Sequence, residues 1–293
     1  MISVKNLFKG YEKGKDVLCD VGLEIPEKQV FGLVGINGAG KSTLLRLIAG
    51  VLRADKGQVC VDGEEVYENE RVKKEIFFLP DDPYYASGVT AKELAVIYQS
   101  LYAFDEETFY GYLQTFSLNA DKPIRNFSKG MKRQVFVALA LAVAPKYLLL
   151  DEAFDGLDPL ARLVFKRGLI ELVEKKGSTV VISSHSLREL EDVCDSYGIL
   201  DHGTITCAGD LERDLGKIHK FQAVFEKDVS PQAFGFKCLS FQKTGRVVQF
   251  LVRGDEKEIL DKIQAFSPLF VEEIGVDFEE LFIGEVQARG YLE

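Results

Sequence analysis

The sequence predicts an α/β protein with a mostly parallel sheet, joined to a small α+β domain at its C-terminal end. Over residues 1–215, short apolar runs alternate with segments of helical periodicity, a pattern typical of parallel strands connected by helices. The runs are apolar at almost every position, as in Val30–Val34, which indicates strands buried on both faces. After about residue 216 the alternation stops, and we take 217–293 as a separate accessory domain.

The elements of the first domain follow from apolar runs and from end signals. Strands are expected at 30–34, 59–61, 76–79, 147–150, 179–183 and 196–200, with a turn at Asp62-Gly63 after the second. Helices are expected at 42–49, 90–101, 106–116, 128–144, 158–174 and 187–193. Thr90 and Glu93 have capping-box spacing, and Asp158 before Pro159 is a favourable helix start. Because 88–145 contains only helical patterns, we expect an inserted helical subdomain there.

The accessory domain has fewer signals. Two apolar runs, 221–225 and 247–252, predict strands. The segment 255–266 has the periodicity of an amphipathic helix, with Asp255 as its cap.

Composition excludes several classes of protein. The chain has 293 residues, of which 46% are hydrophobic and 28% charged, which is ordinary for a globular protein and excludes a disordered or fibrous one. Lys and Arg number 36 and Asp and Glu 46, and the net charge of −10 argues against a nucleic-acid partner. The most apolar run, 135–144, is about half the roughly 20 residues that a membrane-spanning helix needs.

The N-terminal segment and the cysteines indicate the compartment. The first 15 residues have no basic stretch followed by an apolar one, so we expect no secretory signal and a cytoplasmic protein. The five cysteines are scattered and have no CxxC spacing. We therefore interpret Cys19, Cys60, Cys194, Cys207 and Cys238 as reduced packing residues.

A glycine-rich segment after the first buried strand carries the strongest functional signal. The residues Gly35-Ile-Asn37-Gly38-Ala39-Gly40-Lys41-Ser42-Thr43 match GxxxxGK[ST], with a strand before them and a helix after. Backbone amides of such a loop and the helix N-terminus bind phosphate oxygens. Lys41 is expected to reach the β and γ phosphates, and Ser42 to hold Mg²⁺. The alternative is a plain glycine turn with an exposed lysine.

Two carboxylates follow another buried strand, in Tyr147-Leu-Leu-Leu-Asp151-Glu152. The carboxyl ends of parallel strands are where ligands bind in such sheets. We expect Asp151 to hold Mg²⁺ through water and Glu152 to polarise a water for attack on the γ-phosphate. Taken alone, the pair could equally be an exposed turn at the strand end. With the phosphate loop it predicts a nucleotide-hydrolysing core.

The segment Phe127-Ser128-Lys-Gly130-Met131 before a long helix resembles the signature motif of ABC ATPases, whose usual form is Leu-Ser-Gly-Gly-Gln. Ser128 and Gly130 match that form, whereas Phe127, Lys129 and Met131 depart from it.

Three further motifs of this family are present, each in its expected place along the chain. Tyr11 looks like the aromatic residue that stacks on adenine, and Gly156-Leu157-Asp158 looks like the D-loop that touches a partner subunit. His185, at the end of a strand, looks like the switch histidine that contacts the γ-phosphate.

The resemblance covers about residues 1–215 and implies a P-loop NTPase fold with an antiparallel β part at its N-terminus. It implies ATP and Mg²⁺ as cofactors, and hydrolysis that depends on Glu152, His185 and Lys41. ATP would be clamped between two facing subunits, in a homodimer or in a heterodimer with a related ATPase. The remaining partners implied are transmembrane permease subunits, which would hold the chain on the cytoplasmic face of a membrane. The segment 276–282 looks like the ending of ATPases of ABC-2-type export systems.

One position departs from the family in a way that matters. After the strand 76–79, the family usually has a glutamine that senses Mg²⁺, but this chain has Asp81. We expect its carboxylate to accept hydrogen bonds from metal-bound water, and the alternative is an acidic turn without a role. A smaller departure is Lys28, where the family usually has glycine. His202 and His219 match no motif and are expected at the surface.

Two other functions remain open from the sequence. One is a soluble ABC-type ATPase that acts on DNA or ribosomes. The 41–128 stretch is too short for the coiled-coil insertion of the DNA-repair members, and only one ATPase domain fits, whereas translation-type members usually have two. The other is a nucleotide-gated binding protein in which Asp81 has weakened hydrolysis.

Overall fold

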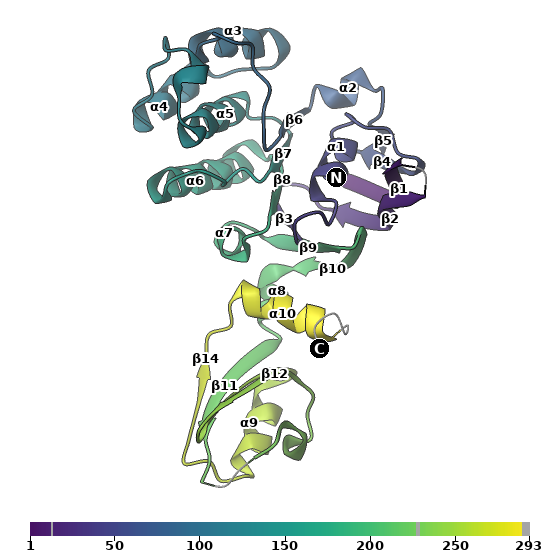
Figure 1. The fold of residues 1–293 in the computed structure, drawn as a ribbon, viewed down its shortest axis with the longest axis vertical. Coiled ribbons are helices and arrows are strands. Elements are labelled where there is room, and N and C mark those ends of the chain that lie inside the picture. Colours follow the sequence, from purple (N-terminus) through teal and green to yellow (C-terminus); the bar gives the residue numbers. More distant parts are fainter. Residues whose placement is uncertain (13, 227–228, 289–293) are drawn as a thin grey trace. The chain divides into compact units, whose positions relative to one another are not determined.

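A computed structural model describes residues 1–12, 14–226 and 229–288 (Figure 1). The chain divides into two compact units, Met1–Ala208 and Gly209–Glu293, and each is treated by itself below. This division lies a few residues before the boundary expected from the sequence. Within the described ranges, no helix combines the length and the apolar character that crossing a membrane requires.

A six-stranded sheet with the order β10-β9-β3-β8-β7-β6 is the centre of the first unit. Strand β3 (Val30–Val34) runs parallel to β8 (Thr179–Ser184) and to β9 (Ser196–Asp201). Strand β7 (Tyr147–Asp151) runs parallel to β8 and to β6 (Ile76–Leu79), and β10 (Thr204–Asp210) lies at the edge. Every residue of β3, β7 and β8 is buried, which confirms the predicted parallel core.

A second, antiparallel sheet has the order β2-β1-β4-β5. Its strands are β1 (Ile2–Glu12), β2 (Lys15–Ile25), β4 (Lys56–Val61) and β5 (Glu64–Glu65). The predicted turn at Asp62-Gly63 joins β4 to β5, and both residues have positive φ, 53° and 80°. The apolar side chains of this sheet share one core with α1 (Lys41–Ile48) and with Tyr147 and Leu149 of β7.

Three helices form the predicted helical part, grouped together in Figure 1: α3 (Ala91–Leu101), α4 (Glu106–Thr115) and α5 (Lys129–Val143). Thr90 and Glu93 make the predicted capping box at the start of α3. Asp158 caps α6 (Pro159–Lys176), which packs against α5. Two short helices, α2 (Glu70–Lys73) and α7 (Leu187–Glu191), complete the unit, and α7 is shorter than predicted.

The second unit has the predicted α+β character. Its antiparallel sheet has the order β12-β13-β11-β14. These strands are β11 (Ile218–Val224), β12 (Cys238–Thr244), β13 (Val247–Arg253) and β14 (Phe270–Ile274). Helix α9 (Glu256–Gln264), capped by Asp255, places Ile259 and Ile263 in one core with the aromatic side chains of β11 and β13. The remaining helices are α8 (Leu211–Leu215) and α10 (Phe278–Ala288).

Three residues outside the motifs clarify expectations from the sequence. Lys28 has φ +57°, in the left-handed region that glycine adopts most easily, which is a physical reason for the glycine that the family usually has there. His202 is exposed, as expected. His219 is less exposed than expected: its side chain is 13% exposed and its Nδ1 lies 2.7 Å from an oxygen of Glu273 on β14.

All five cysteines lie within the described ranges, and none of them forms a disulfide there. Cys194 is buried, and burial raises the pKa of its thiol, so it stays protonated at neutral pH. Its Sγ lies against the backbone of β3, since a Cβ at Gly32 would approach it to 3.0 Å. This agrees with a packing role for this residue.

Candidate active site

The phosphate loop leaves β3 at Val34 and enters α1 at Lys41. A Cβ at Gly35 would lie 2.3 Å from the carbonyl oxygen of Leu200, so only glycine fits between the loop and β9. Gly38 and Gly40 have φ of 83° and 108°, which other residues adopt only at a cost. Steric contact and backbone conformation therefore account for all three glycines of the motif.

Lys41 is the buried cation of the loop, with a side chain that is 6% exposed. Its Nζ donates a hydrogen bond to the Gly35 carbonyl at 2.6 Å and lies 3.3 Å from Oε1 of Glu152. The ammonium is thus held on the inner side of the loop, next to the N-terminus of α1. This combination of a fixed positive charge and a helix N-terminus attracts phosphate groups.

The residues expected to hold Mg²⁺ are brought together in part. Ser42 Oγ donates a hydrogen bond to Oδ1 of Asp151 at 3.1 Å, and Ser183 Oγ donates to the same oxygen at 2.8 Å. A hydroxyl and a carboxylate at this spacing are hard oxygen ligands of the kind that Mg²⁺ prefers, so these residues fit the ion. Asp81, the third residue expected to hold Mg²⁺, has a different partner. Its carboxylate binds Arg133, and no hydrogen bond joins it to Ser42 or Asp151 within the described chain.

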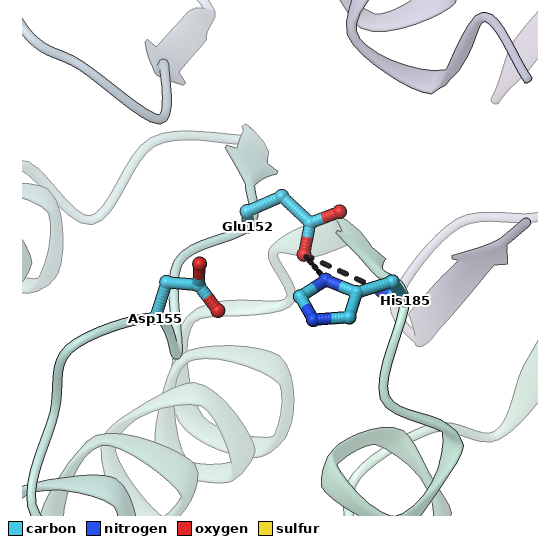
Figure 2. Close-up of side chains that lie close together, drawn as sticks. All are labelled: Glu152, Asp155 and His185. Carbon is cyan, nitrogen blue, oxygen red and sulfur yellow. Dashed lines mark hydrogen bonds and ion pairs between the residues drawn. The ribbon is translucent and has the colours of Figure 1, made fainter. Parts of the chain in front are cut away.

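Glu152 and His185 lie in contact, as Figure 2 shows. Nδ1 of His185 is 2.9 Å from Oε2 of Glu152, and the backbone amide of His185 donates to the same oxygen at 3.3 Å. Glu152 has φ +48°, a left-handed conformation that costs a non-glycine residue about 1–3 kcal/mol. Its amide donates to both the carbonyl and the hydroxyl of Ser183, at 3.2 and 3.1 Å, and these bonds hold the conformation.

Asp155 was not expected in the site from the sequence. Its carboxylate lies beside the imidazole of His185, with ligand atoms of Glu152, Asp155 and His185 all within 4.8 Å of one another (Figure 2). A tight turn brings it there, since the Asp155 amide donates to the Glu152 carbonyl at 3.0 Å. The only signal in the sequence was its position three residues after Glu152.

The remaining residues that the sequence analysis expects to bind nucleotide lie on separate elements. Tyr11 of β1 is 57% exposed, and its hydroxyl lies 3.2 Å from Oγ1 of Thr43, so its ring stands next to the start of α1. Ser128 caps α5 and accepts a hydrogen bond from Met131 N at 3.2 Å. A Cβ at Gly130 would lie 2.4 Å from the Gly156 carbonyl, so the start of α5 packs directly on the D-loop backbone.

Gly130 therefore contacts the D-loop of its own chain, while the hydroxyl of Ser128 accepts from the amide of Met131. Among the described residues, no hydrogen bond joins either of them to the phosphate loop of the same chain. Asp158, at the end of the D-loop, caps α6 with one carboxylate oxygen, which accepts from Ala161 N at 2.9 Å.

A chain of hydrogen bonds that the sequence did not indicate connects the D-loop to the segment of His185. Arg162 of α6 donates from Nε to the Leu157 carbonyl at 3.0 Å, and its Nη1 lies 2.7 Å from Oε1 of Glu189. Oε2 of Glu189 accepts a hydrogen bond from Ser184 Oγ at 3.1 Å, immediately before His185.

Comparison with known proteins assigns the family. A family model described as ABC transporter matches residues 18–155. The ABC transporter ATP-binding protein YtrB of Bacillus subtilis (strain 168) is 30% identical over 287 residues, which cover 97% of this chain and 98% of that protein. The chain belongs to the ABC transporter ATP-binding proteins. The lantibiotic transport ATP-binding protein SrtF of Streptococcus pyogenes is 32% identical over 231 residues, 78% of this chain and 99% of that protein.

Solved structures agree with the family. An ATP-binding subunit of an ABC transporter covers 73% of this chain and 91% of its own, with a TM-score of 0.67 and 29% identity. The dimeric ATP-binding cassette MJ0796, bound to ADP and Pi, covers 72% and 99% with a TM-score of 0.65. At 24% identity, the second match supports the fold alone. The predicted P-loop NTPase fold is confirmed, and the chain is an ABC ATPase that binds ATP.

Proposed function

We propose that this chain is the ATP-hydrolysing subunit of an exporter whose transmembrane permease subunits are separate chains. The observation that supports catalysis most directly is the contact of Glu152 with both Lys41 and His185, at 3.3 and 2.9 Å. A carboxylate in contact with a histidine and next to a phosphate-binding lysine can accept the proton of an attacking water.

The roles of the residues follow from these contacts. Lys41 and the loop amides bind the β and γ phosphates, and an incoming phosphate competes with Glu152 for the Lys41 ammonium. His185 orients the Glu152 carboxylate through the 2.9 Å contact. Ser42 and Asp151 would hold Mg²⁺, which supplies charge neutralisation of the phosphates when bound. Tyr11 offers an exposed ring for the adenine next to Thr43.

We further propose that two subunits share each nucleotide. Ser128 and Gly130 lie at the start of α5 and Asp158 at the start of α6, and Gly130 packs on the D-loop of its own chain, so in a dimer these residues are available to the nucleotide of a facing subunit. The MJ0796 cassette, which has the same fold, is described as dimeric with ADP and Pi bound. The partner is a second copy of this chain or a related ATPase.

The export direction and the cellular location are part of the same proposal. SrtF is named for lantibiotic transport, and LptB of Haemophilus influenzae, 32% identical over 229 residues, for lipopolysaccharide export. MetN of Clostridioides difficile, 32% identical over 238 residues, is named for methionine import, so the relatives include both directions. The resemblance of 276–282 to ABC-2-type exporters favours export. Permease subunits would hold the chain on the cytoplasmic face of the membrane.

Phosphate release by the purified full chain tests the catalytic part. Lys41→Ala should weaken nucleotide binding, and Glu152→Gln should preserve binding, abolish turnover and accumulate a nucleotide-bound dimer on gel filtration. Lys257→Ala, which changes an exposed lysine in α9 of the second unit, is the matched control and should resemble the wild type. Binding without turnover in the wild type would instead support a nucleotide-gated binding protein. Identification of the membrane protein that copurifies with the chain tests the proposal of separate permease subunits. The direction of transport can then be assayed with that membrane protein.

A further inference from the structure

Arg133 is a buried guanidinium on α5, the helix that begins at the Ser128 cap, and its side chain is 3% exposed. Its Nη1 donates to the Pro80 carbonyl at 3.1 Å, and its Nη2 donates to the Asp81 carbonyl and to Oδ1 of Asp81, both at 2.6 Å. All three acceptors belong to the segment that directly follows β6. One side chain of α5 therefore binds the end of a strand of the central sheet.

The charge at Asp81 matters for this contact. A buried guanidinium is stable only when nearby groups accept its hydrogen bonds and balance its charge. A carboxylate together with well-placed carbonyls does both. The Asp81 side chain is 51% exposed, so the carboxylate itself is still partly hydrated. An amide at this position could accept a hydrogen bond from Arg133 but would leave its charge without the carboxylate.

The segment after Asp81 continues along the same face of α5. The ring of Tyr85 lies 6.1 Å from that of Phe136, and the Lys132 ammonium lies over the Tyr85 ring at 5.6 Å. A groove of about 340 Å³ is lined by both segments. Contacts at 132, 133 and 136 are on adjacent turns of one helix face, so the strand end is fixed to α5 over its first two turns.

We propose that Asp81 and Arg133 form a positioning pair that fixes α5 to the end of β6 and so sets where Ser128 and Gly130 meet the nucleotide of a facing subunit. This rests on the proposed function, because it requires that Ser128 and Gly130 act on a shared nucleotide. It also gives Asp81 a role other than metal binding. The pair acts on the rate at which the two subunits form a competent site, and it leaves the phosphate loop of each chain unchanged.

Asp81→Asn in the full chain is the central test. This substitution removes the negative charge of an exposed side chain and keeps its shape. Asp82→Asn, at the neighbouring exposed carboxylate, is the matched control. Since a misplacement of about 1 Å can cost up to roughly a hundredfold in rate, we expect kcat to fall about tenfold or more in Asp81→Asn. The affinity of the phosphate loop for nucleotide should stay at the wild-type value, and Asp81→Glu should recover part of the rate.

A double-mutant cycle identifies the pair. If the two residues act together, Asp81→Asn combined with Arg133→Gln should be no slower than Arg133→Gln alone. In the Glu152→Gln background, Asp81→Asn should reduce the ATP-dependent dimer on gel filtration. Because a change at the buried Arg133 can destabilise the fold, thermal unfolding is measured first, and the Asp81 variants alone keep the test complete.

Two results would overturn the proposal. One is a kcat of the Asp81→Asn variant that lies within about twofold of the kcat of the Asp82→Asn variant. The other is an Asp81→Asn variant whose lost rate returns at high Mg²⁺, because that would assign Asp81 to the metal. Either result leaves the ATPase assignment intact, whereas turnover that survives Lys41→Ala would contradict the proposed function itself.

Discussion

Ser183 should control the geometry of both carboxylates of the site, although no motif names it. Its hydroxyl donates to Asp151 at 2.8 Å and accepts from the Glu152 amide at 3.1 Å. In Ser183→Ala, Asp151 loses a hydrogen bond to a charged group, worth about 1.5–3 kcal/mol. If that free energy is lost from the transition state, kcat falls roughly ten- to hundredfold, since about 1.4 kcal/mol corresponds to a factor of ten. The Mg²⁺ concentration for half-maximal rate should also rise, because Asp151 would be less well oriented.

A buried serine directly before the same strand supplies the control. Ser178 is also buried, and its hydroxyl donates to the Pro145 carbonyl at 2.7 Å, at the opposite end of β8 from the site. Ser178→Ala should also lower the free energy of unfolding, by about 0.5–1.5 kcal/mol because its acceptor is a neutral carbonyl, and should leave kcat unchanged. Phosphate release is measured for both variants over a Mg²⁺ titration, beside thermal unfolding. Equal kcat and equal Mg²⁺ dependence in the two variants would refute the reasoning about Ser183.

Further predictions concern contacts outside the phosphate loop. Arg162→Gln should slow turnover several-fold without changing nucleotide affinity, because it breaks the link from Leu157 to Glu189; unchanged turnover with a normal melting temperature would contradict this. Burial would raise the pKa of Asp62, but hydrogen bonds from Lys146 and other donors outweigh it and hold the pKa below its usual range. A lowered pKa gives stability that is present above the unfolded pKa of about 3.9 and is lost as the pH falls below it. Asp62→Asn should therefore destabilise the protein near neutral pH and lose that difference in acid, as chemical unfolding at several pH values would measure.

Local signals predicted most of the first unit. The capping box, the cap before proline and the turn at Asp62-Gly63 each depend on residues no more than four positions apart. Each is found at its predicted position. Long antiparallel strands such as β1 and β2 were not located from residues alone, because only one of their faces is buried and several register shifts interrupt their pairing. The prediction of α7 to residue 193 overestimated it by two residues, and helix ends are the least certain part of such predictions.

In the candidate site, too, local contacts could be predicted from the sequence and long-range contacts could not. The residues that contact one another within a motif, such as Gly35 and Lys41, are given by their spacing in the chain. Asp81 and Arg133 are 52 residues apart, and Ser183 and Asp151 are 32 apart, so no local pattern could pair them. Their partners are decided by the order of strands in the sheet, where β7 lies between β6 and β8.

These longer-range contacts all end on the motif residues or on the elements that carry them. Ser183 contacts Asp151 and Glu152, and Glu189 contacts the segment before His185. Arg133 joins the helix that begins at Ser128 to Asp81. The motifs therefore determine which reaction the chain can perform, while side chains outside them determine the positions from which it is performed. A change at such a side chain should alter the rate and the coupling between subunits without changing any motif residue, and by our proposal the exchange of the usual glutamine for Asp81 acts on the rate in the same way.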